Sequence, residues 1–328
     1  MALGFGLLGN LNIHESTEIA QRAEELGYDS LWFAEHNFSR DGVSALAVAA
    51  MATKRMMLGP AVVPIFTRSA WLLANTFASL DEIAKGRMVL GVGAGSRVLI
   101  KAQGIAYEKP LVALREYVEV CRLIWNTEVG QHISYEGQML KLEDAELDFA
   151  PHRRDIPVYL GPTGPKACAL SGEIGDGALL NAFLPASYAI EAKSWIAEGA
   201  ASVGRKLDSF DIAMLCVTCV ADSKEEAHDY LRPMIASYLT RLPDIAKHTS
   251  IWGDEWERLA VAVNQGGGEA GAKYISDELL DEITICGNID DCRKSYKRYR
   301  DAGIDHVILF SFGDERRALE SLTPEAMA

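Results

Sequence analysis

Short apolar runs alternate along the chain with longer stretches in which apolar residues recur every three to four positions. The short runs predict buried strands and the longer stretches predict amphipathic helices. Eight strands are predicted, at Leu3–Leu8, Ser30–Ala34, Met57–Val63, Met88–Val92, Val158–Leu160, Ala178–Asn181, Asp211–Val220 and His306–Phe310. Eight helices are predicted, at Ser16–Leu26, Val43–Thr53, Ala70–Ile83, Leu111–Trp125, Lys166–Ile174, Ser187–Val203, Lys224–Tyr238 and Ile289–Ala302. This alternation predicts an α/β fold, and eight such units form a (β/α)8 TIM barrel.

Two stretches are longer than a minimal barrel requires. Residues 131–151, after the fourth helix, alternate polar and apolar positions around the turn signal Glu136-Gly137. This pattern predicts an extended insertion between the fourth and fifth strands. Residues 243–285, before the eighth strand, carry Trp252, Trp256 and three consecutive glycines. Long insertions on barrels form either the rim of the site or contacts between subunits. We expect one domain over residues 1–328 with these two insertions.

An open, doubly wound sheet is the competing architecture. Its support is Gly91-Val-Gly93-Ala-Gly95-Ser96, which resembles a dinucleotide-binding loop but has Ser96 in place of the last glycine. A dinucleotide-binding fold also carries this loop after its first strand, whereas here it follows the fourth. The barrel is therefore preferred.

Composition narrows the choice of partners. The 328 residues are 49% hydrophobic and 24% charged, as in an ordinary globular protein. A net charge of −14 argues against binding to nucleic acid or an anionic membrane surface. The N-terminus has no basic segment of a signal peptide, so we expect a cytoplasmic protein. Six scattered cysteines predict free thiols, and the histidines show no metal-ligand spacing, so no metal is expected.

Candidate site residues follow the predicted strands, because barrel active sites lie where strands end. The second strand ends in Glu35 and His36, and an imidazole there can change its charge near neutral pH. The third strand runs between two prolines to Pro64, which predicts a bulge. Arg68 beyond it could bind a carboxylate or phosphate. A structural histidine and a surface ion pair of Arg68 are the alternatives.

The turn after the fifth strand has the features of a phosphate site. Gly161 and Gly164 allow close approach, Thr163 and Lys166 add a donor and a positive charge, and a helix N-terminus follows. A tight, capped turn is the structural alternative. The chain lacks the P-loop, nucleophile-elbow and zinc-protease motifs, so a bound cofactor is expected to carry the chemistry.

Several stretches, in their order and spacing, resemble the bacterial luciferase-like superfamily of flavin- and deazaflavin-dependent oxidoreductases over nearly the whole chain. The matching stretches are 26–36, 58–64, 77–87, 90–95, 156–161 and 170–177. Within the superfamily the chain most resembles the methylenetetrahydromethanopterin reductase branch, which uses the deazaflavin coenzyme F420.

The resemblance implies a (β/α)8 barrel with a non-prolyl cis peptide in the bulge of the third strand. It places His36 beside the cofactor ring, and Val62, Val63 and Pro64 behind that ring. It also implies that Ser96 and Arg97 join residues 161–166 at the phosphate end. Asn181, at the end of the sixth strand, completes the set of candidate cofactor-binding residues. Homodimers are common in the superfamily, and helix Leu111–Trp125 could bury its apolar face against a second copy.

Two departures from the deazaflavin branch affect the expected activity. Acids common at the ends of the first and fourth strands are replaced by Leu8-Gly9 and Gly95-Ser96. Because these acids are missing and Arg97 resembles a phosphate-binding arginine of flavin monooxygenases, the leading hypothesis is a monooxygenase that uses reduced FMN. His36 and Glu35 would be its catalytic residues, its substrate a small organic molecule, and a separate flavin reductase a partner.

Two other functions remain open at this point. The first alternative is F420-dependent hydride transfer of the methylenetetrahydromethanopterin reductase type. The second is a cofactor-free barrel that binds a flavin or acts as a nonfluorescent partner subunit.

Overall fold

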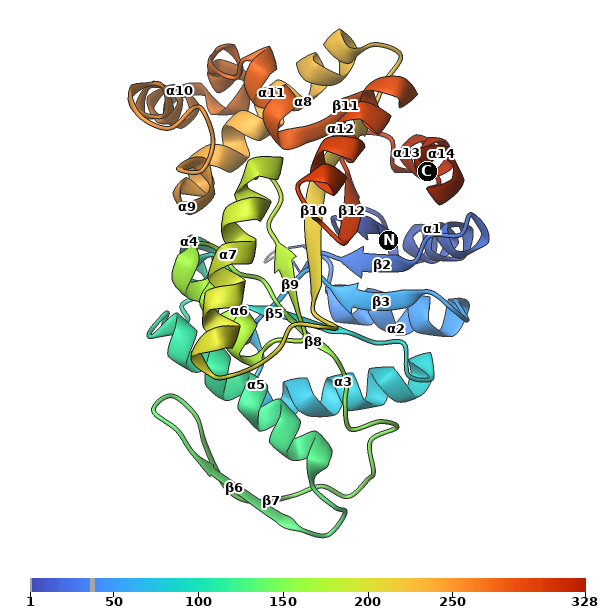
Figure 1. Cartoon of the computed structure of the whole chain (residues 1–328), viewed down its shortest axis with the longest axis vertical. Coiled ribbons are helices and arrows are strands. Elements are labelled where there is room, and N and C mark those ends of the chain that lie inside the picture. Colours follow the sequence, from blue (N-terminus) through green and yellow to red (C-terminus); the bar gives the residue numbers. More distant parts are fainter. Residues whose placement is uncertain (1, 36–38) are drawn as a thin grey trace.

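The computed structural model describes residues 2–35 and 39–328, and its core is a barrel of parallel strands surrounded by helices (Figure 1). The barrel strands are β1 (Ala2–Leu7), β2 (Ser30–Phe33), β3 (Met57–Pro60), β4 (Val63–Pro64), β5 (Leu90–Gly93), β8 (Val158–Leu160), β9 (Gly177–Leu180), β10 (Asp211–Val220) and β12 (His306–Ser311). Their order is β3-β2-β1-β12-β10-β9-β8-β5-β4. Since β3 and β4 are neighbouring parts of one stretch of chain, the sheet curls back on itself. This confirms the predicted (β/α)8 barrel and all eight predicted strands.

The predicted helices are present as well. The elements that alternate with the strands are α1 (Ile13–Glu25), α2 (Gly42–Ala52), η1 (Ile65–Thr67), α3 (Ala70–Ala84), α4 (Arg97–Ala102), α5 (Pro110–Asn126), α6 (Pro165–Ile174), α7 (Ala186–Ser202), α8 (Lys224–Arg241), α12 (Ile289–Asp301), α13 (Glu315–Ser321) and α14 (Pro324–Met327). Within the described residues, no helix is both long and apolar enough to cross a membrane.

The two insertions take different forms. The first is an antiparallel hairpin, β6 (His132–Glu136) and β7 (Lys141–Glu146), which extends below α5 in Figure 1. The second contains α9 (Pro243–Ala246), α10 (Asp254–Gly271), η2 (Ala272–Tyr274) and α11 (Asp277–Ile283). It ends in a strand that the sequence pattern did not predict, β11 (Thr284–Gly287), which pairs with the second half of β10.

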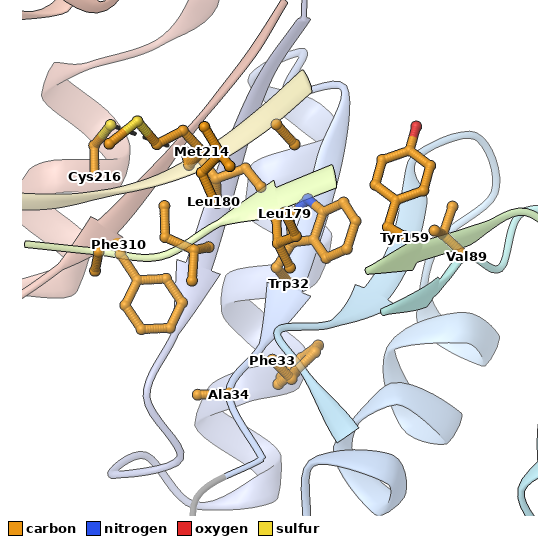
Figure 2. Close-up of a cluster of buried hydrophobic side chains, with 14 of the residues drawn as sticks. Trp32, Phe33, Ala34, Val89, Tyr159, Leu179, Leu180, Met214, Cys216 and Phe310 are labelled. Carbon is orange, nitrogen blue, oxygen red and sulfur yellow. Dashed lines mark hydrogen bonds between the residues drawn. The ribbon is translucent and has the colours of Figure 1, made fainter. Parts of the chain in front are cut away.

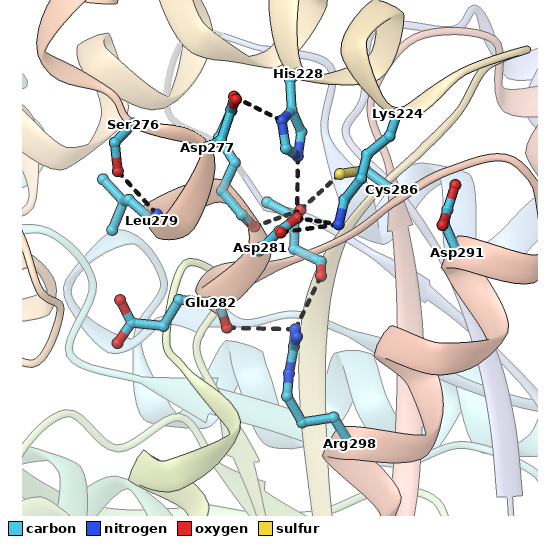
Figure 3. A network of polar contacts seen from close by, with 12 residues as sticks. Lys224, His228, Ser276, Asp277, Leu279, Asp281, Glu282, Cys286, Asp291 and Arg298 are labelled. Carbon is cyan, nitrogen blue, oxygen red and sulfur yellow. Dashed lines mark hydrogen bonds and ion pairs between the residues drawn. The ribbon is translucent and has the colours of Figure 1, made fainter.

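A network of ion pairs joins the second insertion to α8 (Figure 3). Lys224, His228 and Arg232 lie one helical turn apart on α8 and face Asp277 and Asp281, one turn apart on α11. Both ring nitrogens of buried His228 contact carboxylates, at 2.9 Å from Asp277 and 3.2 Å from Asp281. These contacts thus hold α11, the last helix of the insertion, against α8.

Large side chains fill the barrel where neighbouring strands carry glycine. A Cβ on Gly6 would lie 2.1 Å from the Phe310 ring, and one on Gly59 would lie 2.7 Å from the Trp32 ring. Figure 2 shows Trp32 beside Tyr159, with ring centres 5.9 Å apart, and Phe310 farther along the interior. These glycines are therefore required by packing.

A chain of hydrogen bonds links several buried polar groups of the barrel interior. Trp32 Nε1 donates to Ser30 Oγ, which lies 2.7 Å from His306 Nε2. The other ring nitrogen of His306 lies 3.2 Å from Asp211, whose carboxylate also accepts the Tyr159 hydroxyl at 2.9 Å. Paired buried groups of this kind stabilise the core without leaving a reactive side chain free.

The cysteines are buried free thiols, as the sequence predicted. Burial raises the pKa of Cys121 to about 12 and that of Cys168 to about 11. Because the thiolate is the reactive form, these side chains are chemically inert near neutral pH.

Candidate active site

The end of β2 is held by a cluster of charged groups. Glu35 Oε2 accepts the backbone N–H of Gly42 at 2.6 Å, and its Oε1 lies 3.3 Å from Arg68. Arg68 also pairs with Asp41, which caps α2 through the Ser44 N–H. Partial burial acts to raise the pKa of Asp41, but the hydrogen bonds of Ser44 and the charge of Arg68 outweigh it and lower that pKa. Arg68 is thus engaged by two carboxylates, and His36 lies outside the described residues.

The bulge of the third strand contains the expected cis peptide, between Ala61 and Val62. The Val62 side chain extends over two neighbouring strands: a Cβ on Gly93 would lie 2.9 Å from it, and one on Gly161 3.0 Å. Val63 and Pro64 form β4 and pair with β5. The geometry therefore brings the ends of β4, β5 and β8 together around Val62.

Beyond β5, Ser96 is the N-cap residue of α4 and Arg97 is the first residue of that helix. The Arg97 guanidinium lies over the Tyr107 ring, 5.2 Å from its centre. Tyr107 donates its hydroxyl to the Gly95 carbonyl at 3.3 Å and packs against Phe66. Tyr107, which the sequence analysis did not single out, orients the Arg97 guanidinium at the mouth of the barrel, the end where the carboxyl ends of the strands lie.

The loop after β8 opens α6 as expected for a phosphate site. Gly164 has φ +81° and is the N-cap residue, with Pro165 in the first helical turn. A Cβ on Gly164 would meet nothing within 4 Å, so its α-carbon faces open space. Lys166 is exposed and Thr163 half-buried. The Gly164 N–H donates to the Tyr188 hydroxyl, an interaction the sequence did not predict.

An aromatic wall lies past the ends of β9 and β12. Half-buried Asn181 follows β9, and Phe183 comes two residues later with φ +68°. Phe183 stacks on Tyr238 of α8, with ring centres 4.9 Å apart, and both contact Phe312 after β12. We define these three residues as the aromatic wall.

A carboxylate is also present beside the end of β1. Glu315, at the start of α13, accepts a hydrogen bond from the Asn10 side chain. The sequence has no acid at the end of this strand, and Glu315 supplies one from the far end of the chain.

One cavity lies at the opposite end of the barrel, beside the starts of β8, β9 and β10. It has a volume of about 690 Å³ and is lined by residues that include Arg122, Arg205 and Tyr159. Arg122 already bonds the Ile174 carbonyl and Asp176, and Arg205 bonds the Gly172 and Gly175 carbonyls. Since its arginines are engaged, we place the site at the carboxyl ends of the strands, as in other barrels.

Sequence reasoning missed Tyr107, Tyr188, the aromatic wall and Glu315 for a common reason. An aromatic residue in a helix or loop has the same pattern as a core residue, and an acid at a helix start has the pattern of a cap. Only the folded arrangement brings these residues to the strand ends.

Comparison with known proteins identifies the family. The family model described as luciferase-like monooxygenase matches residues 4–306. A 5,10-methylenetetrahydromethanopterin reductase of Archaeoglobus fulgidus is 32% identical over 313 residues, covering 94% of this chain and 92% of the relative. The protein of the same name from Methanolobus tindarius is 30% identical over 317 residues, covering 94% and 93%.

Solved structures share the fold. The coenzyme F420-dependent tetrahydromethanopterin reductase of Methanopyrus kandleri has a TM-score of 0.86 at 24% identity and covers 99% of both chains. The oxygenating constituent of 3,6-diketocamphane monooxygenase from Pseudomonas putida, in complex with FMN, has a TM-score of 0.70 at 20% identity, covering 100% of this chain and 98% of its own. The chain therefore belongs to the luciferase-like monooxygenase family of oxidoreductases.

Proposed function

We propose that this oxidoreductase transfers hydride between coenzyme F420 and a small organic substrate, with a methylenetetrahydropterin as the first candidate. The observation that carries the proposal is the pair of relatives, 32% and 30% identical over 94% of the chain, that are named methylenetetrahydromethanopterin reductases. Support for the FMN monooxygenase that the sequence first suggested comes only from more distant structural neighbours. The relatives thus favour the deazaflavin alternative.

The residues at the mouth fit a planar cofactor with a phosphate-bearing side chain. Open space at Gly164 and the free first-turn amides of α6 form a cradle for the phosphate, and exposed Lys166 adds a positive charge. Thr163, Gly161, Ser96 and Arg97 complete this end. Val62, Val63 and Pro64 would support the ring, with Asn181 beside it.

The cofactor, when bound, supplies the hydride donor or acceptor. The chain positions the cofactor and the substrate, excludes water from them and supplies a proton. The aromatic wall excludes water from the substrate and offers it an apolar surface. His36 and Glu315 are our candidates for holding the proton, because His36 follows β2 in the sequence and Glu315 lies beside the end of β1. Glu35, which is paired with Arg68 and the Gly42 N–H, acts by joining the end of β2 to the start of α2, the two described segments that precede and follow His36.

The decisive test is an anaerobic assay with reduced F420 and methylenetetrahydromethanopterin. We expect oxidation of the coenzyme, followed by its absorbance, in step with loss of the pterin substrate. Replacement of F420 by reduced FMN under the same conditions is the control. In a separate aerobic assay, substrate oxygenation with reduced FMN that requires the enzyme, together with no binding of F420, would overturn the proposal and return the monooxygenase hypothesis to first place.

We also propose that the chain is one domain and acts as a homodimer or larger homo-oligomer. The helix that suggested association, α5, buries most of its apolar residues within its own chain. Met51 on α2, with 79% of its surface exposed, is a better candidate for contact with a second copy. Light scattering of the purified protein tests this, and a monomer would contradict it.

A further inference from the structure

Tyr188 lies behind the loop that opens α6. It is 2% exposed, and its hydroxyl accepts the Gly164 N–H at 3.0 Å. Cys168, in the first turn of α6, has its sulfur 3.9 Å from the same hydroxyl. Burial raises the pKa of Tyr188, so this hydroxyl is neutral over the working range of an enzyme. A single side chain of α7 thus bonds the turn that starts α6.

Because of this contact, the backbone N–H groups of the loop that opens α6 do not all point the same way. The Gly164 N–H points to Tyr188, and Pro165 has no N–H. The next amides, those of Lys166 and Ala167, lie in the first helical turn and have no acceptor within the helix. They are the backbone donors that the loop can offer to an anion. Their direction depends on the turn at Gly164, whose positive φ of +81° belongs to a residue with wide conformational freedom.

Tyr188 itself is held firmly. Its ring makes edge-on contacts with Trp195, at 5.8 Å between ring centres, and with His248 of the second insertion, at 4.7 Å. The backbones of α6 and α7 are in direct contact: a Cβ on Gly172 would lie 1.9 Å from the Ile196 carbonyl oxygen. The hydroxyl therefore has a fixed place relative to α6.

We propose that Tyr188 is a positioning residue for the coenzyme phosphate, because its hydroxyl fixes the turn from which the first amides of α6 reach that group. The proposal rests on the proposed function, in which a phosphate-bearing coenzyme binds at α6. Through His248, the same side chain connects the phosphate site to the second insertion.

The test is the variant Tyr188→Phe, which keeps the ring and its contacts but removes the hydroxyl. Binding of oxidised F420 and of the same deazaflavin without its phosphate is measured by fluorescence, with no substrate present. We expect the Kd for F420 to rise about tenfold, the size of one lost buried hydrogen bond. The Kd for the phosphate-free compound should change less than about twofold, since no contact to the ring is lost.

The matched control is Tyr28→Phe. Tyr28 is also buried, and its hydroxyl donates to the Leu319 and Leu322 carbonyls, far from α6 in the sequence. Thermal unfolding of both variants records their loss of stability. A selective loss of F420 binding in Tyr188→Phe alone supports the proposal. Equal effects on both ligands, or the same effect in Tyr28→Phe, overturn it.

The wild-type titration separates this inference from the proposed function. If wild type prefers F420 to the phosphate-free compound but Tyr188→Phe binds like wild type, only the role of Tyr188 fails. If wild type binds neither compound, the proposed function fails, and the role of Tyr188 fails with it.

Discussion

The carboxylate of Glu35 lies 3.3 Å from the guanidinium of Arg68 and bonds the first amide of α2 with its other oxygen. This one side chain links the end of β2, the start of α2 and the segment after the third-strand bulge. Glu35 and Gly42, which this hydrogen bond joins, stand on either side of His36 in the sequence.

Glu35→Ala should lower kcat about tenfold or more, because small displacements of a catalytic group are costly. Glu35→Gln keeps an oxygen for the Gly42 N–H, so its kcat should lie between the kcat of Glu35→Ala and that of wild type. Steady-state kinetics and F420 binding measure both effects. Wild-type turnover in Glu35→Ala would show that catalysis does not depend on this contact.

His36→Ala should reduce turnover by about 10²- to 10⁴-fold, the usual contribution of a general acid or base. The affinity for F420 should stay near wild type, because the proposed role is proton transfer and not binding. Anaerobic stopped-flow measurements separate the two quantities. Unaltered turnover would remove His36 from the proposed chemistry.

Glu315→Gln tests whether the carboxylate beside β1 takes part in proton transfer. The amide keeps the size of the side chain but cannot exchange a proton, so kcat should fall about tenfold or more and its pH profile should change shape. The exposed Glu320 of the same segment provides the control Glu320→Gln. Identical pH profiles of Glu315→Gln and wild type would exclude the role.

Tyr238→Ala tests the aromatic wall as a substrate surface. Loss of the stacked ring should raise KM for the substrate about tenfold, in line with the energy of a buried aromatic pair plus lost apolar contact. The Kd of F420 should stay unchanged. Tyr230, 58% exposed on the same helix, gives the control Tyr230→Ala. An increase in the Kd of F420 with no change in the substrate KM would show that the aromatic wall contacts the coenzyme and not the substrate.

Stability in acid should depend on Glu24. Partial burial acts to raise its pKa, but the backbone N–H groups of Arg55, Met56 and Lys54 bond the carboxylate and lower it. A lowered pKa means that this stabilisation is complete above about pH 4.5 and is lost as the pH falls through the folded-state pKa.

The variant Glu24→Gln should therefore lose about 1 kcal/mol of unfolding free energy at neutral pH and less at low pH. Urea unfolding at several pH values measures this. Glu25→Gln, whose exposed carboxylate pairs with Arg22, is the control. A constant difference between wild type and Glu24→Gln across pH would contradict the assignment.

The sequence was sufficient for the barrel because each of its strands is a buried apolar run followed by a helix with its own periodicity. It missed β11, whose four residues directly follow the helical pattern of α11. The site was harder. Gly164 was expected to meet a phosphate, but its N–H is directed to Tyr188. Nothing in the first turn of α7 distinguishes Tyr188 from a core residue, because its partner is a backbone group brought close only by folding.

The glycine and aromatic pairs inside the barrel set a limit on laboratory evolution of this enzyme. The Phe310 ring occupies the volume that a side chain at position 6 would need. Gly6 can therefore be replaced by a larger residue only after Phe310 has been replaced by a smaller one. The same order of events applies to Gly59 and Trp32. Libraries that randomise one position at a time would therefore recover glycine at these sites, whereas variants such as Gly6→Ala combined with Phe310→Leu would open sequence space that single steps do not reach.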